Sequence, residues 1–280
     1  MNRRLALLGV RTAFRTVGRV APGSAARWAE RLFCRPPRAP VRSHEEDFLA
    51  SGRAFGIPSS EGTLAAWEWG AGPTVLLVHG WGSRAARFRV LGPSLVESGF
   101  RVVAYDHPAH GRSPGKRTSL PESTGVLLEV ARHLGPLFGA VGHSFGGAAI
   151  AVALSRRLAL QRAVLIAPYA APPEILEQYA RIVALPATVT RRMQQNLERR
   201  LQLKIGDLYV PRLVGRVAIP ALVVHDRHDE DIPFADGEAI ARAWPGAKFV
   251  VTHGLGHHAI MRDESVARQV AAFLAEGIAP

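Results

Sequence analysis

Apolar residues after position 54 gather in short consecutive runs that alternate with longer amphipathic stretches. The runs are TVLLVH (74–79), FRVVAY (100–105), FGAVGH (138–143), RAVLIA (162–167), ALVVH (221–225) and KFVVT (248–252). Apolar residues on consecutive positions are typical of strands buried on both faces. Helical stretches lie between them at 85–98, 121–134, 145–157, 234–243 and 264–276. This alternation predicts an α/β fold with a mostly parallel central sheet flanked by helices, and GTLAAWEWGAG (62–72) is expected to add an antiparallel edge.

Two segments depart from this rhythm. Residues 171–220 contain no strong strand but hold two stretches of helical composition, so they predict a helical cap inserted above the carboxyl edge of the sheet. Residues 1–42 predict a helical arm, in which Ala6, Val10, Ala13, Val17 and Val20 form one apolar face, followed by a second short helix at 24–33. The expected domains are therefore the arm, 1–42, and an α/β domain, 43–280, with the cap at about 171–220.

Charge is concentrated in the arm. The net charge is +12, yet residues 1–42 alone hold ten arginines and a single acid, Glu30. The charge pattern of this amphipathic helix permits peripheral contact with an anionic membrane but does not require it, and an amphipathic helix pair packed on the domain is the alternative. No nucleic-acid-binding signature is present, so nucleic acid is not an expected partner. One cysteine and no long apolar run indicate a cytoplasmic protein, peripheral at the membrane if the arm binds lipid.

Two serines match the pattern G-x-S-x-G: Ser144 in VGHSFGG (141–147) and Ser113 in GRSPG (111–115). A nucleophilic serine needs an exposed oxygen on a sharp turn from a strand into a helix, with a free N–H beside it. Ser144 follows a predicted strand and precedes a predicted helix, whose first N–H belongs to Phe145. Ser113 is followed by Pro114, which has no N–H. The sequence therefore favours Ser144 as the nucleophile and Phe145 as an oxyanion donor.

The partners of Ser144 are expected at other strand ends. HGWG (79–82) closes the first buried run and offers the backbone N–H of Trp81 as a second oxyanion donor. GLGHH (254–258) offers His257 as the base, with His258 as the fallback. In HDRHDEDIP (225–233), the three aspartates 226, 229 and 231 compete for the acid, and spacing favours Asp229.

The motifs together resemble the α/β-hydrolase superfamily, from about Arg53 to the C-terminus. They are LLVHGWG, VVAYDHPAHGRSPG, VGHSFGG, HDRHDEDIP and THGLGHH. The chain is similar to bacterial serine esterase/lipase-like members with a short helical cap. The resemblance implies an α/β-hydrolase fold in which Ser144 is the nucleophile, His257 the base and Asp229 the acid. A glycine is usual at the position of Asp226, so the choice between Asp226 and Asp229 stays open.

The expected activity is a serine carboxylesterase reaction on a small-molecule acyl ester of short to medium chain length. It needs no metal or organic cofactor, and the histidines 225, 228, 253 and 257 fit no metal-binding spacing. A thioesterase, a lactonase or another acyl hydrolase would use the same site. The alternative from a different class is a non-catalytic scaffold that binds a membrane or a protein through residues 1–42. The sequence does not indicate an oligomeric state.

Overall fold

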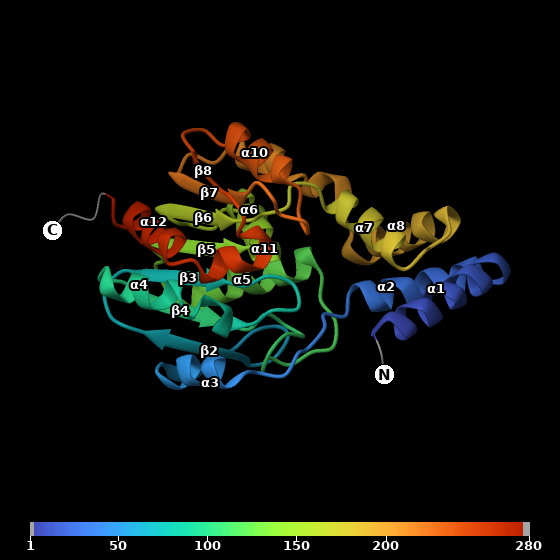
Figure 1. The fold of residues 1–280 in the computed structure, drawn as a ribbon, viewed down its shortest axis with the longest axis horizontal. Coiled ribbons are helices and arrows are strands. Elements are labelled where there is room, and N and C mark those ends of the chain that lie inside the picture. The colour runs from blue at the N-terminus through green and yellow to red at the C-terminus, as the bar shows by residue number, and fades with distance from the viewer. Residues whose placement is uncertain (1–2, 277–280) are drawn as a thin grey trace. The chain divides into compact units, whose positions relative to one another are not determined.

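The computed structural model describes residues 3–276, which divide into two compact units. Unit 1 combines the N-terminal segment up to Arg35 with Ala171–Tyr209, and unit 2 combines Pro36–Ala170 with the chain from Val210 onward. The predicted arm is therefore divided at Arg35, and its larger part groups with most of the predicted cap. Figure 1 shows this grouping: the blue helices α1 and α2 and the yellow helices α7 and α8 belong to unit 1.

Within residues 3–276, unit 2 contains an eight-stranded sheet of order β1-β2-β4-β3-β5-β6-β7-β8. The strands are β1 (Arg53–Ile57), β2 (Leu64–Trp69), β3 (Thr74–Val78), β4 (Arg101–Tyr105), β5 (Gly139–His143), β6 (Arg162–Ile166), β7 (Ala221–Asp226) and β8 (Lys248–Thr252). β4, β3 and β5 to β8 are parallel, so all of their carboxyl ends meet at one edge. That edge carries the candidate site.

Helices cover both faces of this sheet (Figure 1). The helical elements of unit 2 are α3 (Ser43–Ala50), η1 (Ala85–Phe88), α4 (Leu91–Glu97), α5 (Leu120–Leu134), α6 (Phe145–Ser155), α9 (Val210–Val214), α10 (Phe234–Ala243), α11 (Gly256–Ala259), η3 (Ile260–Arg262) and α12 (Glu264–Ala275). α4 packs against α12, and α5 packs against α6. Alternate strand residues such as Leu77 and Val141 share a buried core with Leu95 of α4 and Val270 of α12. The burial of both faces explains why these strands lack polar alternation.

The predicted α/β architecture is confirmed, with two corrections at the sheet margins. β1 was not expected, because only Ile57 of its five residues is buried. It pairs with β2, so the predicted antiparallel strand β2 lies inside the sheet between β1 and β4. At the other margin, β8 has no buried residue although its run is apolar, because it pairs only with β7.

Unit 1 is helical. It consists of α1 (Arg3–Val20), α2 (Pro22–Phe33), α7 (Pro172–Ile182), α8 (Ala187–Leu201) and η2 (Ile205–Leu208). α2 presents three buried alanines, Ala25, Ala26 and Ala29, and packs closely on α8. The shared core also contains Phe14, Leu176, Val189, Met193 and Leu197. The N-terminal helices and the inserted helices therefore stabilise one another.

The apolar face predicted for α1 is wrong at its C-terminal end. Phe14 is fully buried, whereas Val17 and Val20 are 37% and 83% exposed. Gly18 faces the same core, since a Cβ there would lie 2.9 Å from a side-chain atom of Pro186. Leu5 and Leu8 are exposed. Contact of this arginine-rich helix with lipid stays a prediction. Within the described residues, no helix combines the length and the apolar character needed to cross a bilayer.

Phe14→Ala should destabilise unit 1 by about 3–5 kcal/mol, because it opens a cavity in a core of limited size. Phe14 also packs against Trp28, with ring centroids 4.2 Å apart and ring planes tilted by 31°. The measurement is urea unfolding followed by far-UV circular dichroism. Leu8→Ala is the control, because Leu8 lies exposed on the same helix. Equal unfolding midpoints for the two variants would contradict this packing.

Candidate functional site

Ser144 occupies a strained turn between β5 and α6. Its φ is +53° and its ψ is −117°, a combination that a residue with a side chain seldom adopts. Its backbone is held from both sides: its N–H donates to Ile166 O at 2.9 Å, and its carbonyl accepts from Ala148 N at 3.1 Å. Such strain persists only where the surrounding structure enforces it, and it is common at reactive residues.

Two glycines allow that turn to pack tightly. A Cβ at Gly146 would lie 2.0 Å from Val78 O at the end of β3, and a Cβ at Gly142 would lie 2.5 Å from Gly147 N. Neither distance is compatible with a side chain, so α6 can approach the sheet only with glycine at both positions. This closeness brings the N-terminus of α6 beside the loop that follows β3.

That loop contains Trp81, the predicted second oxyanion donor. A Cβ at Gly80 would lie 3.3 Å from Ser144 Cβ, so the loop borders the serine. Gly80 O accepts from His79 Nδ1 at 2.8 Å and from Ser83 N at 3.1 Å. In a planar trans peptide the carbonyl and the next N–H point in opposite directions. The Trp81 N–H is therefore directed away from these donors.

Both predicted oxyanion donors are available. Within residues 3–276, neither the Trp81 N–H nor the Phe145 N–H has a hydrogen-bond acceptor. Phe145 is the first residue of α6, where N–H groups lack intrahelical partners and the helix dipole favours negative charge. Burial lowers the pKa of His79 to about 4, so its ring is neutral at pH 7. The bond to Gly80 O then requires the tautomer in which Nδ1 carries the proton.

The predicted acid, Asp229, and the predicted base, His257, meet where the chain continues after β7 and in α11, which follows β8. His257 Nδ1 donates to Asp229 Oδ2 at 2.8 Å, and the Asp229 side chain is completely buried. The other oxygen, Oδ1, accepts from the backbone N–H of Asp231 at 2.9 Å and of Ile232 at 2.8 Å. Burial by itself raises the pKa of Asp229. Hydrogen bonds from His225, His257 and Ile232 lower the pKa by more than burial raises it, so the carboxyl is ionised.

Asp226, the rival acid, has other partners. Its Oδ2 accepts from Thr252 Oγ1 at 2.8 Å and from Leu255 N at 3.0 Å, and its Oδ1 accepts from His228 N at 2.9 Å. These bonds join the loop after β7 to β8 and to the loop that carries His257. The structure therefore brings Asp229, and not Asp226, to His257.

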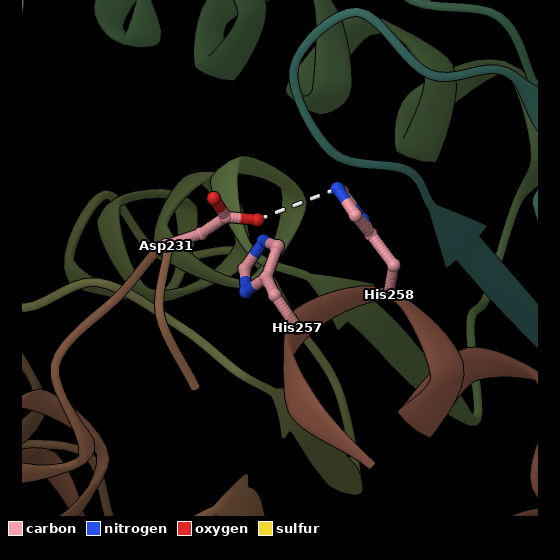
Figure 2. Close-up of side chains that lie close together, drawn as sticks. All are labelled: Asp231, His257 and His258. Atoms are coloured by element: carbon pink, nitrogen blue, oxygen red, sulfur yellow. Dashed lines mark ion pairs between the residues drawn. The ribbon is translucent and has the colours of Figure 1, made fainter. Parts of the chain in front are cut away.

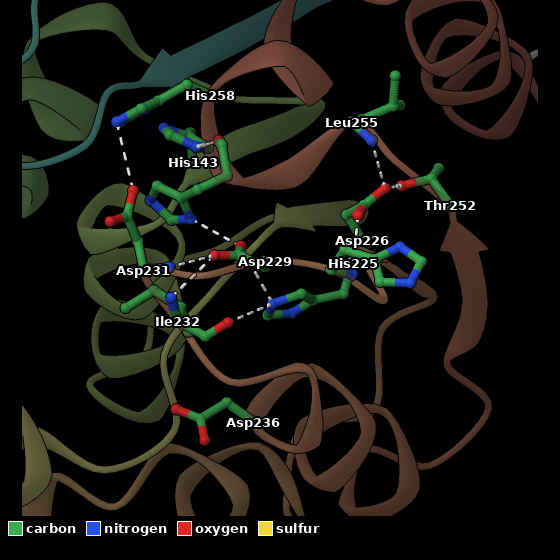
Figure 3. A network of polar contacts seen from close by, with 12 residues as sticks. His143, His225, Asp226, Asp229, Asp231, Ile232, Asp236, Thr252, Leu255 and His258 are labelled. Carbon is green, nitrogen blue, oxygen red and sulfur yellow. Dashed lines mark hydrogen bonds and ion pairs between the residues drawn. The ribbon is translucent and has the colours of Figure 1, made fainter.

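Two further histidines, His143 and His225, lie beside the pair formed by Asp229 and His257; Figure 3 shows both of them near Asp229. His225 Nε2 donates to Ile232 O at 3.2 Å and lies 3.4 Å from Asp229 Oδ2. His143 Nε2 donates to His257 O at 3.0 Å. Burial holds the pKa of His143 well below its usual range, so the ring is neutral. The sequence analysis assigned no role to either histidine. The signals available were that His143 directly precedes Ser144 and that His225 lies four residues before Asp229.

The described contacts connect Ser144 to His257, the predicted base, through His143. His143 precedes Ser144, and its ring centroid lies 4.8 Å from that of His257. Within residues 3–276, no hydrogen bond joins the Ser144 hydroxyl to the His257 ring. Catalytic hydrogen bonds often tighten only when substrate binds. The fallback base, His258, lies at the surface and pairs with Asp231.

Ser113, the second pattern match, is engaged elsewhere. Its hydroxyl donates to Asp106 O at 2.6 Å and accepts from Ala65 N at 3.0 Å, and the residue is buried. The Asp106 carboxylate in turn accepts from the N–H groups of Ala85 and Arg112, both at 2.7 Å. These bonds tie the loop after β4 to β2 and η1, so the GRSPG segment is structural.

Asp226 should make stability depend on acid pH. Burial by itself raises the pKa of Asp226. Hydrogen bonds from Thr252, His228 and Leu255 outweigh this effect and bring the pKa to about 2, from the usual 3.8. A carboxyl whose folded-state pKa is depressed stabilises the fold above its unfolded pKa, and this contribution is lost as pH falls through the folded value. Asp226→Asn should therefore lower the urea midpoint at pH 6 and flatten its decline between about pH 4 and pH 2. Parallel pH curves for variant and wild type would contradict this role.

The fold and the site together define the class of protein. A strained serine between a buried strand and a helix, at the carboxyl edge of a mostly parallel sheet, is typical of α/β hydrolases. The chain belongs to the α/β-hydrolase superfamily: the family model described as serine aminopeptidase, S33 matches residues 71–210, and the model described as TAP-like protein matches residues 208–280.

Similar proteins agree with this placement. A non-heme haloperoxidase of Rhodococcus erythropolis is 32% identical over 139 residues, which are 48% of this chain and 50% of that protein. The mouse monoglyceride lipase is 32% identical over 114 residues, 36% of this chain and 37% of that protein. The chain thus spans half or less of these curated relatives. The solved structure of a Pyrococcus furiosus esterase superposes with a TM-score of 0.66 at 20% identity, covering 86% of this chain and 98% of that one, which shows a shared fold.

Proposed function

We propose that this chain is a serine hydrolase that cleaves carboxylic esters of short to medium acyl chains through an acyl-enzyme on Ser144. The observation that carries the proposal is the hydrogen bond from His257 to the buried, ionised Asp229. A buried carboxylate in this position fixes the tautomer in which Nδ1 carries the proton, and it leaves Nε2 free to accept one. The strained Ser144 at the same edge of the sheet supplies the group that gives up that proton.

In the first step, Ser144 Oγ attacks the ester carbonyl carbon while His257 Nε2 takes the hydroxyl proton. The carbonyl π electrons move onto oxygen, and the N–H groups of Trp81 and Phe145 stabilise the oxyanion. The C–O bond to the alcohol then breaks, and the leaving oxygen receives the proton from His257. The product of this step is an ester of the acyl group with Ser144.

In the second step, water repeats the attack. His257 Nε2 takes a proton from water as its oxygen bonds to the acyl carbon, and the same proton returns to Ser144 Oγ when the second tetrahedral intermediate collapses. Asp229 stays ionised throughout and stabilises the imidazolium. The cycle releases a carboxylic acid and needs neither a metal nor an organic cofactor.

A substrate panel tests the proposal. Purified protein is assayed with p-nitrophenyl esters from acetate to palmitate, with an acyl thioester and with a lactone, and is treated with a fluorophosphonate probe. We expect covalent labelling and the highest kcat/KM on the short and medium esters. Faster turnover of the thioester or the lactone would replace the ester proposal with one of those activities on the same serine. Absence of both turnover and labelling would contradict a hydrolase and favour the non-catalytic scaffold.

A further inference from the structure

Three polar side chains meet at the solvent side of His257. Figure 2 shows Asp231 and His258 facing each other across the His257 ring. His258 Nε2 lies 3.3 Å from Asp231 Oδ2, and one ligand atom from each of the three residues lies within 4.8 Å of the others. The Asp231 and His258 side chains are 57% and 67% exposed, whereas His257 is buried. The group is therefore open to ions from solution through Asp231 and His258, and His257 is its innermost member.

We propose that Asp231, His257 and His258 form a binding site for Zn²⁺ or a similar divalent transition-metal ion, and that the bound ion switches the active site off. The binding half of the proposal concerns these three residues alone. The inhibition half rests on the function proposed above, because it requires His257 to act as the base.

The spacing suits a tetrahedral ion. Zn²⁺ lies about 2.0–2.2 Å from histidine nitrogen and carboxylate oxygen, so two ligand atoms of a tetrahedron are about 3.4 Å apart. The separation of 3.3 Å between Asp231 and His258 already matches this value. The limit of 4.8 Å on the remaining separations leaves at most about 1.4 Å to close. The two exposed side chains can supply this movement by rotation.

The surroundings of His257 match those of a metal ligand. A ligating histidine usually donates its other ring N–H to a carboxylate, which fixes the ring and makes the ligating nitrogen more basic. His257 Nδ1 donates to Asp229 at 2.8 Å, so Nε2 is the nitrogen left for an ion. The backbone N–H of Asp231 donates to the same carboxylate at 2.9 Å, so both ligand-bearing loops are anchored on Asp229. Figure 3 shows Asp231 beside Asp229.

Occupancy would conflict with the proposed hydrolysis. Nε2 has one lone pair, and the mechanism needs it to accept the proton of Ser144. A metal bound to Nε2 uses that lone pair, so the base is lost while the ion remains. Two histidines and one aspartate would leave the fourth position of a tetrahedral ion to water. We expect inhibition that a chelator reverses and that weakens at low pH, because protonated histidines do not bind metal.

The binding test uses the full chain, freed of metal with a chelator and dialysed. Isothermal titration with ZnCl₂ should give one ion per chain. Asp231→Asn and His258→Gln should each raise the Kd tenfold or more. His253→Gln is the matched control, because His253 is an exposed histidine of the same loop region outside the cluster. Zinc binding that is absent, or equal in wild type and both cluster variants, would overturn the site.

The inhibition test measures p-nitrophenyl butyrate hydrolysis in the same titration. Activity should fall over the zinc range in which binding occurs and should return on addition of EDTA. Asp231→Asn and His258→Gln should keep the metal-free rate and require tenfold more zinc for half inhibition. Full activity at saturating zinc, or a rate that rises with zinc, would overturn the inhibition. If the chain binds zinc through these residues but hydrolyses no ester, the site stands and the proposed function fails.

Discussion

Replacing Ser144 by alanine is expected to lower kcat/KM on p-nitrophenyl esters by about 10⁴-fold or more. The variant lacks the oxygen that forms the acyl-enzyme, whereas the oxyanion donors and the Asp229–His257 pair are retained. Fluorophosphonate labelling should disappear together with activity. The measurement is hydrolysis of a short-chain ester, with far-UV circular dichroism to show that the variant is folded.

Ser113→Ala is the control that the chain itself provides, because Ser113, in GRSPG, matches the same G-x-S-x-G pattern as Ser144. Its hydroxyl donates to Asp106 O and accepts from Ala65 N, so the substitution removes both bonds, leaves the partly buried Ala65 N–H without its acceptor, and should cost about 1–3 kcal/mol of stability. The folded variant should still label and turn over ester. Retained labelling in Ser144→Ala, with loss in a folded Ser113→Ala, would transfer the nucleophile to Ser113.

The strained turn was predictable because its signals are local. The buried strand β5 ends at His143 and α6 begins at Phe145, with Gly142 and Gly146 on either side of Ser144, and each signal has a short-range physical cause. The same holds for β3 to β7, which are apolar at consecutive positions because both of their faces are covered. Asp229 and His257 were found by their positions after the apolar runs that form β7 and β8.

Features that depend on distant contacts were not predictable. α1 has more than one apolar row. Phe14 is buried in a core that it shares with residues of α8, which lie more than 160 positions further along the chain, whereas Val20 is exposed. β1 has little apolar pattern of its own and forms by pairing with β2. The contact of His143 with His257 arises only when the loops after β5 and β8 are brought together.

Asp226 shows how a departure from a family pattern acquires a structural role. The resemblance predicts a glycine at position 226, and the aspartate found there leaves two candidates, Asp226 and Asp229, for the acid. In the fold, that carboxylate accepts hydrogen bonds from Thr252 and from the backbone N–H of Leu255, two residues before His257. Asp226 therefore holds the segment that precedes His257, the proposed base, while Asp229 contacts His257 itself.

This difference gives the second large prediction. Asp229→Asn should lower kcat by about 10³–10⁴-fold with little change in KM. The asparagine amide can donate to His257 Nδ1, which favours the tautomer with the proton on Nε2. In that tautomer Nε2 cannot accept the proton of Ser144. Fluorophosphonate labelling should slow by a similar factor, because it depends on the same proton transfer.

Asp226→Asn is the matched comparison, since it removes the same charge three residues away. It should reduce kcat far less, by about tenfold or below, because His257 keeps its bond to Asp229 while the loop is held less firmly. Its main effect should be on stability, since asparagine has one accepting oxygen. It can keep the bonds from Thr252 and Leu255 only by turning its NH2 group toward the His228 N–H, which then loses its acceptor. A larger loss of kcat in Asp226→Asn than in Asp229→Asn, with both variants folded, would make Asp226 the acid. The 2.8 Å contact between Asp229 and His257 would then be structural rather than catalytic.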